Sequence, residues 1–184
     1  SKEIQPDSEW AALREAQTKA LKLDQVGMAV TIDIGLADDI HPKNKQEVGR
    51  RLALVALAGS YGKNVSGSAP VFRNYRIKGD KMELDFGQKQ DGFQIKGTTL
   101  KGFTIAGPDR VFYPAEAMVQ NGKIIVFSPE VSIPLAARYG WADNPDVRRE
   151  RPPGCSFPDR LLVDGVSLNL FSSLCKLMEA LPSS

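Results

Sequence analysis

The sequence lacks several features that would by themselves suggest a function. It contains no apolar run that approaches the roughly 20 residues needed to cross a membrane. Its 24 basic and 22 acidic residues leave a net charge of only +2, which gives no electrostatic reason to expect nucleic acid as a partner. We therefore predict no membrane and no nucleic-acid partner, and a small neutral or acidic molecule as the ligand.

Cysteine and histidine are also scarce. Both cysteines, Cys155 and Cys175, lie near the carboxy-terminal end, and His41 is the only histidine. The sequence therefore indicates neither a disulfide framework nor a metal site, and we predict no cofactor and no metal. The opening residues, SKEIQPDSEW, have neither a start methionine nor the apolar core of a signal peptide. We expect the chain to begin inside a longer protein.

The single histidine lies between a predicted strand and a predicted helix. Residues 27–34 alternate with the period of a strand. Asn44 then begins a helix, because its side chain can cap free backbone N–H groups and Glu47 follows three residues later, as in a capping box. Glycines, starting with Gly59, end this helix. His41 therefore occupies a loop between the two elements.

Two carboxylates, Asp38 and Asp39, share this loop with His41. In α/β folds, active sites form in loops at the carboxyl ends of strands. A histidine can exchange protons with a substrate near neutral pH, and a carboxylate bonded to its other nitrogen stabilises the imidazolium. Two interpretations remain open from the spacing: a catalytic pair, or a turn whose Asp and His only satisfy backbone groups.

Four blocks of sequence carry a resemblance to a known family. They are WxxLREAQ at 10–17, DIHPKNKQEVGRRLALVALA at 39–58, GFTIAGPDRVFYPAEA at 102–117 and ARYGWADNP at 137–145. Together they resemble the sialate O-acetylesterase family of carbohydrate esterases, within the SGNH hydrolase superfamily. The resemblance implies an enzyme that removes acetyl esters from sugar hydroxyls, typically those of sialic acids, and that commonly acts in the periplasm or outside the cell.

The resemblance also implies a catalytic serine and histidine, and the matching histidine is His41. The superfamily pattern Asp-x-x-His selects Asp38 as the acid, whereas the Asp-Ile-His of many family members selects Asp39, which we favour. The family's serine lies in a Gly-x-Ser block near the start of the catalytic domain, and no such block precedes His41. We expect the serine in a missing amino-terminal half of the same enzyme, so that this chain alone is inactive.

For substrate binding, the resemblance points to the first and last blocks. It implies that Arg14 or Gln17 helps to shape the wall of the site, and that Arg138, Tyr139 and Trp141 contact the sugar. We expect exposed aromatic rings in this region to stack on a pyranose ring. The alternative is a non-catalytic carbohydrate-binding or structural remnant.

We predict an α/β fold in three parts. Residues 1–62 form the carboxy-terminal part of an SGNH-hydrolase catalytic domain, a helix-strand-helix piece of a three-layer fold whose other strands come from elsewhere. Residues 63–147 form an antiparallel, sandwich-like β-region, and residues 148–184 form an atypical tail. In the first part, Asp7 or Ser8 begins a helix that continues to about Leu23. Tryptophan on the apolar face of a helix is usually buried, which predicts that Trp10 lies in the core.

The β-region is predicted from short alternating segments, roughly six strands in all. KGDK at 78–81 and QNGK at 120–123 are typical of hairpin turns. Residues 111–119 are predicted as one strand, and residues 93–95 contribute to another. The Gly- and Ser-rich run at 61–70 is predicted to be a linker, and its serines are not favoured as nucleophiles.

The sequence of the tail, from Arg148 onward, differs from the sequence expected for the family at this position. The family ending Gly-Leu-Pro-Ala-Ala-Pro-Phe-Arg-Thr-Asp can be written in codons that, read two bases later, encode PPGCSFPDR, which is residues 152–160 here. We hypothesise that the gene carries a frameshift close to codon 147. A DNA read across this region is expected to show an insertion or deletion, and an intact reading frame without one refutes the hypothesis.

Overall fold

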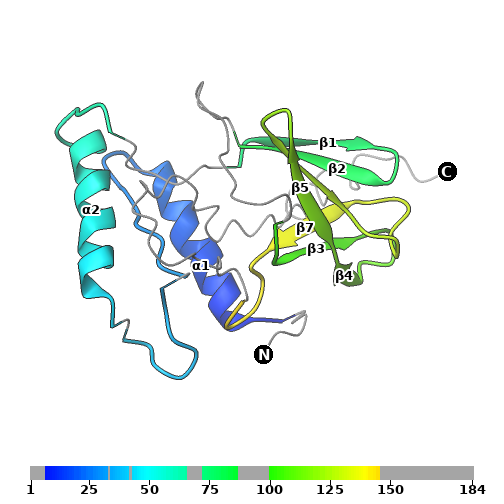
Figure 1. Cartoon of the computed structure of the whole chain (residues 1–184), viewed down its shortest axis with the longest axis horizontal. Helices are drawn as coiled ribbons and strands as arrows, with labels where there is room; N and C mark the ends of the chain where they lie inside the picture. Colours follow the sequence, from blue (N-terminus) through cyan, green and yellow to red (C-terminus); the bar gives the residue numbers. More distant parts are fainter. Residues whose placement is uncertain (1–6, 33, 42, 66–71, 87–99, 146–184) are drawn as a thin grey trace, which may run out of the picture.

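The computed structural model describes residues 7–32, 34–41, 43–65, 72–86 and 100–145. Two helices and the connection between them lie on one side of the molecule, and antiparallel strands lie on the other (Figure 1). Within the described residues, no helix has the length and apolar character needed to span a membrane.

Helix α1 (Glu9–Lys19) begins at a cap that the sequence predicted. The Ser8 hydroxyl accepts a hydrogen bond from the Ala11 N–H at 3.1 Å, which satisfies one of the N–H groups left free at a helix start. A single 3-10 turn, η1 (Ala20–Lys22), continues the helix to Leu23. The predicted start and end of this helical segment are therefore confirmed.

The apolar face of α1 is exposed, so the prediction that Trp10 lies in the core is wrong. Trp10 is 49% exposed and Leu13 is 47% exposed, whereas Ala11 is buried. An apolar helix face is buried only where a second layer of structure packs against it. In the described part of the chain, no layer covers this face of α1.

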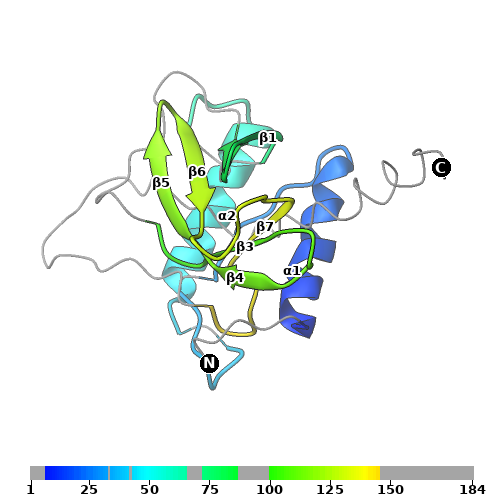
Figure 2. The same cartoon turned by 90° about the vertical axis from the view of Figure 1, so that its right-hand side faces the viewer.

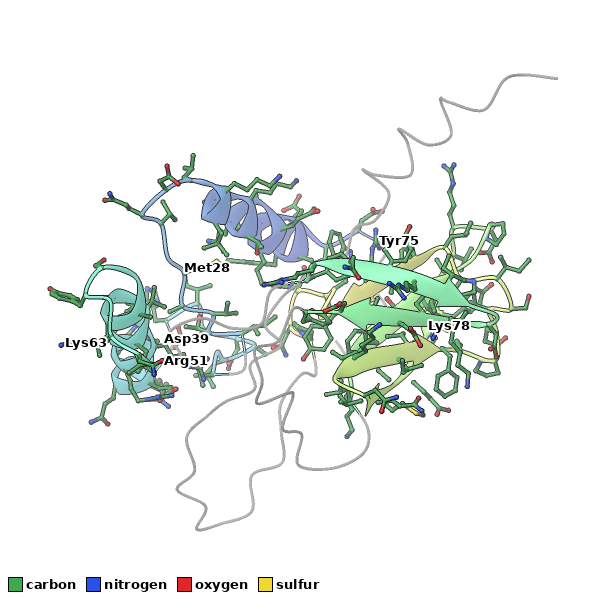
Figure 3. The ribbon with its side chains drawn as sticks, turned by 90° about the horizontal axis from the view of Figure 1, so that it is seen from above. Met28, Asp39, Arg51, Lys63, Tyr75 and Lys78 are labelled. Atoms are coloured by element: carbon green, nitrogen blue, oxygen red, sulfur yellow. The ribbon has the colours of Figure 1, made fainter. Side chains whose placement is uncertain are left out.

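Residues 26–32 do not form the predicted strand. No ladder of hydrogen bonds joins them to another described segment, and they run as a single chain between α1 and α2 (Figures 1 and 3). The alternating pattern is present, but a strand also needs a neighbour to accept and donate hydrogen bonds. The predicted three-layer arrangement is thus represented here by two helices with one unpaired segment between them.

Helix α2 (Lys45–Gly59) has the predicted start and end. The Asn44 side chain accepts a hydrogen bond from the Glu47 N–H at 3.1 Å. The reciprocal half of the capping box does not form, because the Glu47 carboxylate instead accepts hydrogen bonds from Arg50 and Arg51, each at 2.8 Å. These contacts lower the pKa of Glu47 from 4.5 to about 2, mainly through the hydrogen bond from Arg50.

Arg51 connects α2 to the unpaired segment. Its side chain is buried, and its Nη1 donates a hydrogen bond to the Val30 carbonyl at 2.6 Å. Gly27 lies against the same helix, since a Cβ at this position would overlap Val55. A buried arginine and a close glycine contact therefore hold residues 26–32 beside α2 in place of a β-ladder.

Seven strands form two antiparallel sheets in the described part of the β-region. They are β1 (Asn74–Lys78), β2 (Lys81–Asp85), β3 (Phe103–Ala106), β4 (Phe112–Pro114), β5 (Glu116–Gln120), β6 (Lys123–Phe127) and β7 (Ala136–Tyr139). The first sheet has the order β1-β2-β6-β5, and the second has the order β4-β3-β7. Figure 2 shows β3, β4 and β7 beside the β5–β6 hairpin.

A shared hydrophobic core joins the two sheets. Met82, Leu84, Ile124 and Val126 of the first sheet are fully buried, as is Ile105 of the second. In β2, the buried residues alternate with half-buried Glu83 and Asp85, which is the period of two expected for a strand with one buried face. In β6, three consecutive residues are buried. The prediction of an antiparallel β-region is confirmed.

Both predicted hairpin turns are confirmed. Lys78 pairs with Lys81 and Gln120 pairs with Lys123 across two-residue turns. In the second turn, the residues at 121–122 both have positive φ, 51° and 72°, which is the geometry that an Asn-Gly pair favours in a hairpin.

Two strand predictions differ from the structure. Residues 111–119 form two strands rather than one, because the chain leaves the second sheet after β4 and enters the first as β5. The break falls at Ala115, between the last residue of β4, Pro114, and the first residue of β5, Glu116. Strand β7 (Ala136–Tyr139) was not predicted, because this segment was considered only for substrate binding. The strand predicted to include residues 93–95 lies outside the described residues.

Replacing Arg51 with alanine is expected to destabilise the 184-residue chain by about 3 kcal/mol, because the Val30 carbonyl loses its donor and a buried ion pair is broken. Arg50→Ala is the matched control: this side chain is 43% exposed and pairs with the same carboxylate, so its loss is expected to cost under about 1 kcal/mol. Urea unfolding followed by circular dichroism measures both. Equal costs would contradict the role assigned to the Val30 contact.

The stabilising effect of Glu47 is expected to depend on pH. Its pKa is lower in the folded chain than in the unfolded chain, so the ionised carboxylate stabilises the fold above about pH 4.5 and loses this effect as the pH falls toward 2. Glu47→Gln is therefore expected to reduce stability by about 2 kcal/mol near neutral pH and by much less near pH 2. The measurement is urea unfolding of both proteins across this range, and a difference that does not change with pH would contradict it.

Candidate active site

The loop that carries His41 connects the unpaired segment to α2. Leu36 and Asp39 form an isolated antiparallel bridge that folds the loop back on itself. Figures 1 and 2 show residues 34–41 at the same, lower end of the molecule as the start of α1 and residues 140–145. Sequence blocks that are far apart in the chain therefore lie at one end of the fold.

His41 and Asp39 form a hydrogen-bonded pair. The Asp39 Oδ1 accepts a hydrogen bond from the His41 backbone N–H at 2.8 Å and lies 3.2 Å from the ring Nδ1. When Nδ1 carries the proton, it donates to the carboxylate, and the other ring nitrogen, Nε2, is left to exchange protons. The side chain of His41 is 79% exposed and that of Asp39 is 38% exposed, so the pair is accessible to other groups.

The geometry favours Asp39 over Asp38 as the partner of His41. Asp38 is exposed, and the hydrogen bonds of the histidine go to Asp39. The adjacent Asp-Ile-His spacing explains this, because a two-residue offset lets one carboxylate oxygen reach both the backbone and the ring of the histidine. Asp33, the next acidic residue toward the amino terminus, lies outside the described residues.

Within the described ranges, no serine hydroxyl forms a hydrogen bond with His41. Ser8, for example, caps α1 and donates to Asp143 at 2.6 Å. The serines at 66 and 68 lie outside the described residues. The described residues thus contain a histidine–carboxylate pair with no serine bonded to it. They also contain no group of three or more His, Cys, Asp or Glu residues that could hold a metal ion.

Arg138 is the centre of a stacked group on the β-region. Its guanidinium lies 3.9 Å from the ring centroid of Phe112 and 4.2 Å from that of Trp141. Burial lowers the pKa of Arg138, and the negative charges of Asp7 and Glu15 oppose this effect. The planar guanidinium and the two rings therefore stabilise one another through cation–π contacts. The structure therefore places Arg138 and Trp141, two of the residues predicted to bind the substrate, in direct contact.

Arg14 and Ser8 tie this part of the β-region to α1. Arg14 Nη2 donates hydrogen bonds to the carbonyls of Gly140 and Ala142, at 2.9 and 2.6 Å. Burial lowers the pKa of Arg14, and Asp143 acts in the opposite direction. Sequence reasoning had considered Arg14 only for the wall of the site. Its structural role rests on contacts across more than 100 positions of sequence, which no local pattern predicts.

The remaining candidates for substrate binding have different environments. Tyr139 is 8% exposed, and its ring packs 4.7 Å from that of Phe103 in the core, so it is buried rather than exposed as expected. Gln17 is exposed on α1. Trp141 is half-buried beside Arg138. Of the predicted aromatic contacts, Trp141 therefore retains more accessible surface than Tyr139.

Comparison with known proteins shows that this chain is similar to a solved structure. No protein-family model matches the chain, and no curated protein gives a significant match. Among solved structures, the chain is similar to the crystal structure of a carbohydrate acetylesterase from Xanthomonas citri, with 45% sequence identity and a TM-score of 0.74. The match covers 79% of this chain and 34% of that chain, so this chain spans about a third of the length of that protein.

Proposed function

We propose that this chain is the carboxy-terminal part of a carbohydrate esterase that hydrolyses O-acetyl esters of sialic acids or related sugars. The 45% identity to a carbohydrate acetylesterase supports an ester hydrolase that acts on acetylated sugars. Sialic acid as the sugar, the SGNH type of catalytic domain and a periplasmic or extracellular location are proposed from the four sequence blocks. The observation that carries the proposal is the exposed His41–Asp39 pair in a chain of this similarity.

The proposed mechanism uses a serine from sequence outside this chain. His41 Nε2 removes the serine proton while the oxygen attacks the acetyl carbonyl. The imidazolium then gives this proton to the departing sugar oxygen, which leaves an acetyl-serine and a free sugar hydroxyl. Water, deprotonated by the same nitrogen, attacks the acetyl-serine; acetate leaves, and the proton returns to the serine oxygen. Asp39 holds Nδ1 and stabilises the imidazolium in both steps.

The groups that bind the oxyanion are also proposed to lie outside this chain. Such donors contribute several kcal/mol to acyl transfer, and a histidine–carboxylate pair without a nucleophile has no covalent route. This chain alone is therefore expected to have no measurable esterase activity until the missing amino-terminal half is supplied.

A second proposal is that the chain is a carbohydrate-binding or structural remnant. Its support is the β-region, which has a core of its own in the described residues and presents Arg138 and Trp141 as one stacked group. Aromatic rings and arginines can both contact sugars without catalysing a reaction. Binding of O-acetylated sugars in the absence of any complemented hydrolysis would support this proposal over the esterase.

Complementation tests the esterase directly. A hybrid of the Xanthomonas citri acetylesterase, in which this chain replaces the matched third, is assayed with acetylated sialic acid and with p-nitrophenyl acetate. His41→Ala is expected to reduce kcat/KM by about 10²–10⁴-fold, because the general base is lost. Asp39→Asn is expected to produce a large loss as well, since the ring nitrogen loses its acceptor.

Asp38→Asn is the matched control, with the same change of charge one residue away. It is expected to change kcat/KM by less than about threefold. A larger loss from Asp38→Asn than from Asp39→Asn would assign the acid to Asp38. Full activity of the His41→Ala hybrid would reject the esterase mechanism for this chain.

A further inference from the structure

We infer that the outer face of the first sheet binds an acidic polysaccharide, one whose sugars carry carboxylate groups. Two neighbouring groups of side chains form this surface. The cationic patch is Arg76, Lys78, Lys81 and Lys123, and the apolar strip is Phe127 and Met118. The surface uses neither His41 nor the Arg138 group, so the inference goes beyond the proposed function and does not depend on it.

The strand register places these side chains on one surface. Met82 and Leu84 of β2 are buried in the core, and successive side chains of a strand point to opposite faces, so Lys81 and Glu83 lie on the outer face. Figure 3 shows Lys78 on the part of this sheet that lies away from α1 and α2. Across the four strands, one row of paired residues is Lys78, Lys81, Phe127 and Glu116, and the next row is Arg76, Glu83, Ile125 and Met118.

The charge of the cationic patch is only partly balanced by Glu83. Lys78 Nζ lies 2.8 Å from the Glu83 carboxylate, and Lys123 Nζ lies 3.7 Å from it. The hydrogen bond from Lys78 and the positive charges nearby, that of Arg76 included, lower the pKa of Glu83. The side chain of Lys78 is nevertheless 64% exposed. Several cations that share one carboxylate and remain in contact with solvent attract an anionic ligand.

The apolar strip adjoins the cationic patch. Lys81 Nζ lies 4.9 Å from the centroid of the Phe127 ring, and this ring is half-buried. Met118 is 37% exposed in the next row. The C–H groups of a sugar ring can pack against such side chains, while its carboxylate pairs with a neighbouring ammonium or guanidinium group. Cations spread over one face suit a polymer that repeats its carboxylate, because each further contact forms within the same complex.

The mixture of charges favours a sugar polymer over a nucleic acid. Asp85 and Glu116 also lie on the outer face, and their carboxylates repel a dense row of phosphates. Hydroxyl groups of a sugar can instead donate hydrogen bonds to these carboxylates. A membrane surface is also a poor fit, since binding to lipid requires a broad apolar face that enters the bilayer, and the apolar strip is narrow.

Affinity electrophoresis tests the inference with polygalacturonate as the acidic polymer. The control polymer is the same polysaccharide after its carboxyl groups have been reduced to alcohols. The 184-residue chain is expected to bind polygalacturonate at least about tenfold more tightly than the reduced polymer, and this difference is expected to shrink in high salt, because exposed charges are screened. Equal binding of the two polymers, or no binding of polygalacturonate, would overturn the inference.

A matched pair of double variants locates the surface. One combines Lys78→Gln with Lys81→Gln, and the control combines Lys19→Gln with Lys22→Gln on the helical segment. Lys78 and Lys19 are 64% and 65% exposed, and each pairs with one glutamate, so both variants remove two exposed charges. The first is expected to weaken binding of polygalacturonate at least about fivefold, and the control less than about twofold. Equal losses would overturn the inference, since net charge alone would then account for binding.

Other anionic ligands give distinct results. The same assay is run with a single-stranded oligonucleotide, and sedimentation is run with phosphatidylglycerol vesicles. Tighter binding of either probe than of polygalacturonate, lost in the Lys78→Gln/Lys81→Gln variant, would identify a nucleic-acid or membrane surface and overturn the inference. None of these measurements involves ester hydrolysis. Binding of polygalacturonate by a chain that is inactive after complementation would therefore support this surface while rejecting the esterase, and esterase activity without such binding would do the reverse.

Discussion

An extended segment cannot satisfy its own backbone hydrogen-bonding groups, and this constraint governs the amino-terminal half of the structure. Residues 26–32 have the alternating sequence of a strand, but the described part of the chain offers them no neighbouring strand. Arg51 compensates in part by donating to the Val30 carbonyl. Burying an arginine is costly unless its charge is paired, and Glu47 provides the pairing from one turn away.

The elements that sequence predicts well are those specified by neighbouring residues. Ser8 and Asn44 cap their helices through bonds to N–H groups three residues later, and the Asn-Gly turn at 121–122 has the backbone geometry that this pair favours. The contact between Asp39 and His41 belongs to the same class, because the two residues are separated by one position. Each of these features needs no information from the rest of the chain.

The features that sequence does not predict depend on distant residues. The exposure of Trp10 and the absence of a strand at 26–32 both follow from which layers are present, and a helical or alternating pattern is the same whether its partner exists or not. The hydrogen bonds of Arg14 to Gly140 and Ala142 join positions over 100 residues apart. The division of residues 111–119 between two sheets was also not predicted, because it depends on pairing with β3 and β6, which come from other parts of the chain.

Local specification explains why the His41–Asp39 pair is formed within its own loop. The His41–Asp39 pair needs only a short loop, so it forms whether or not the neighbouring strands are present. In the proposed esterase, a nucleophile and oxyanion donors would instead have to approach His41 Nε2 from other elements, within hydrogen-bonding distance and correctly oriented.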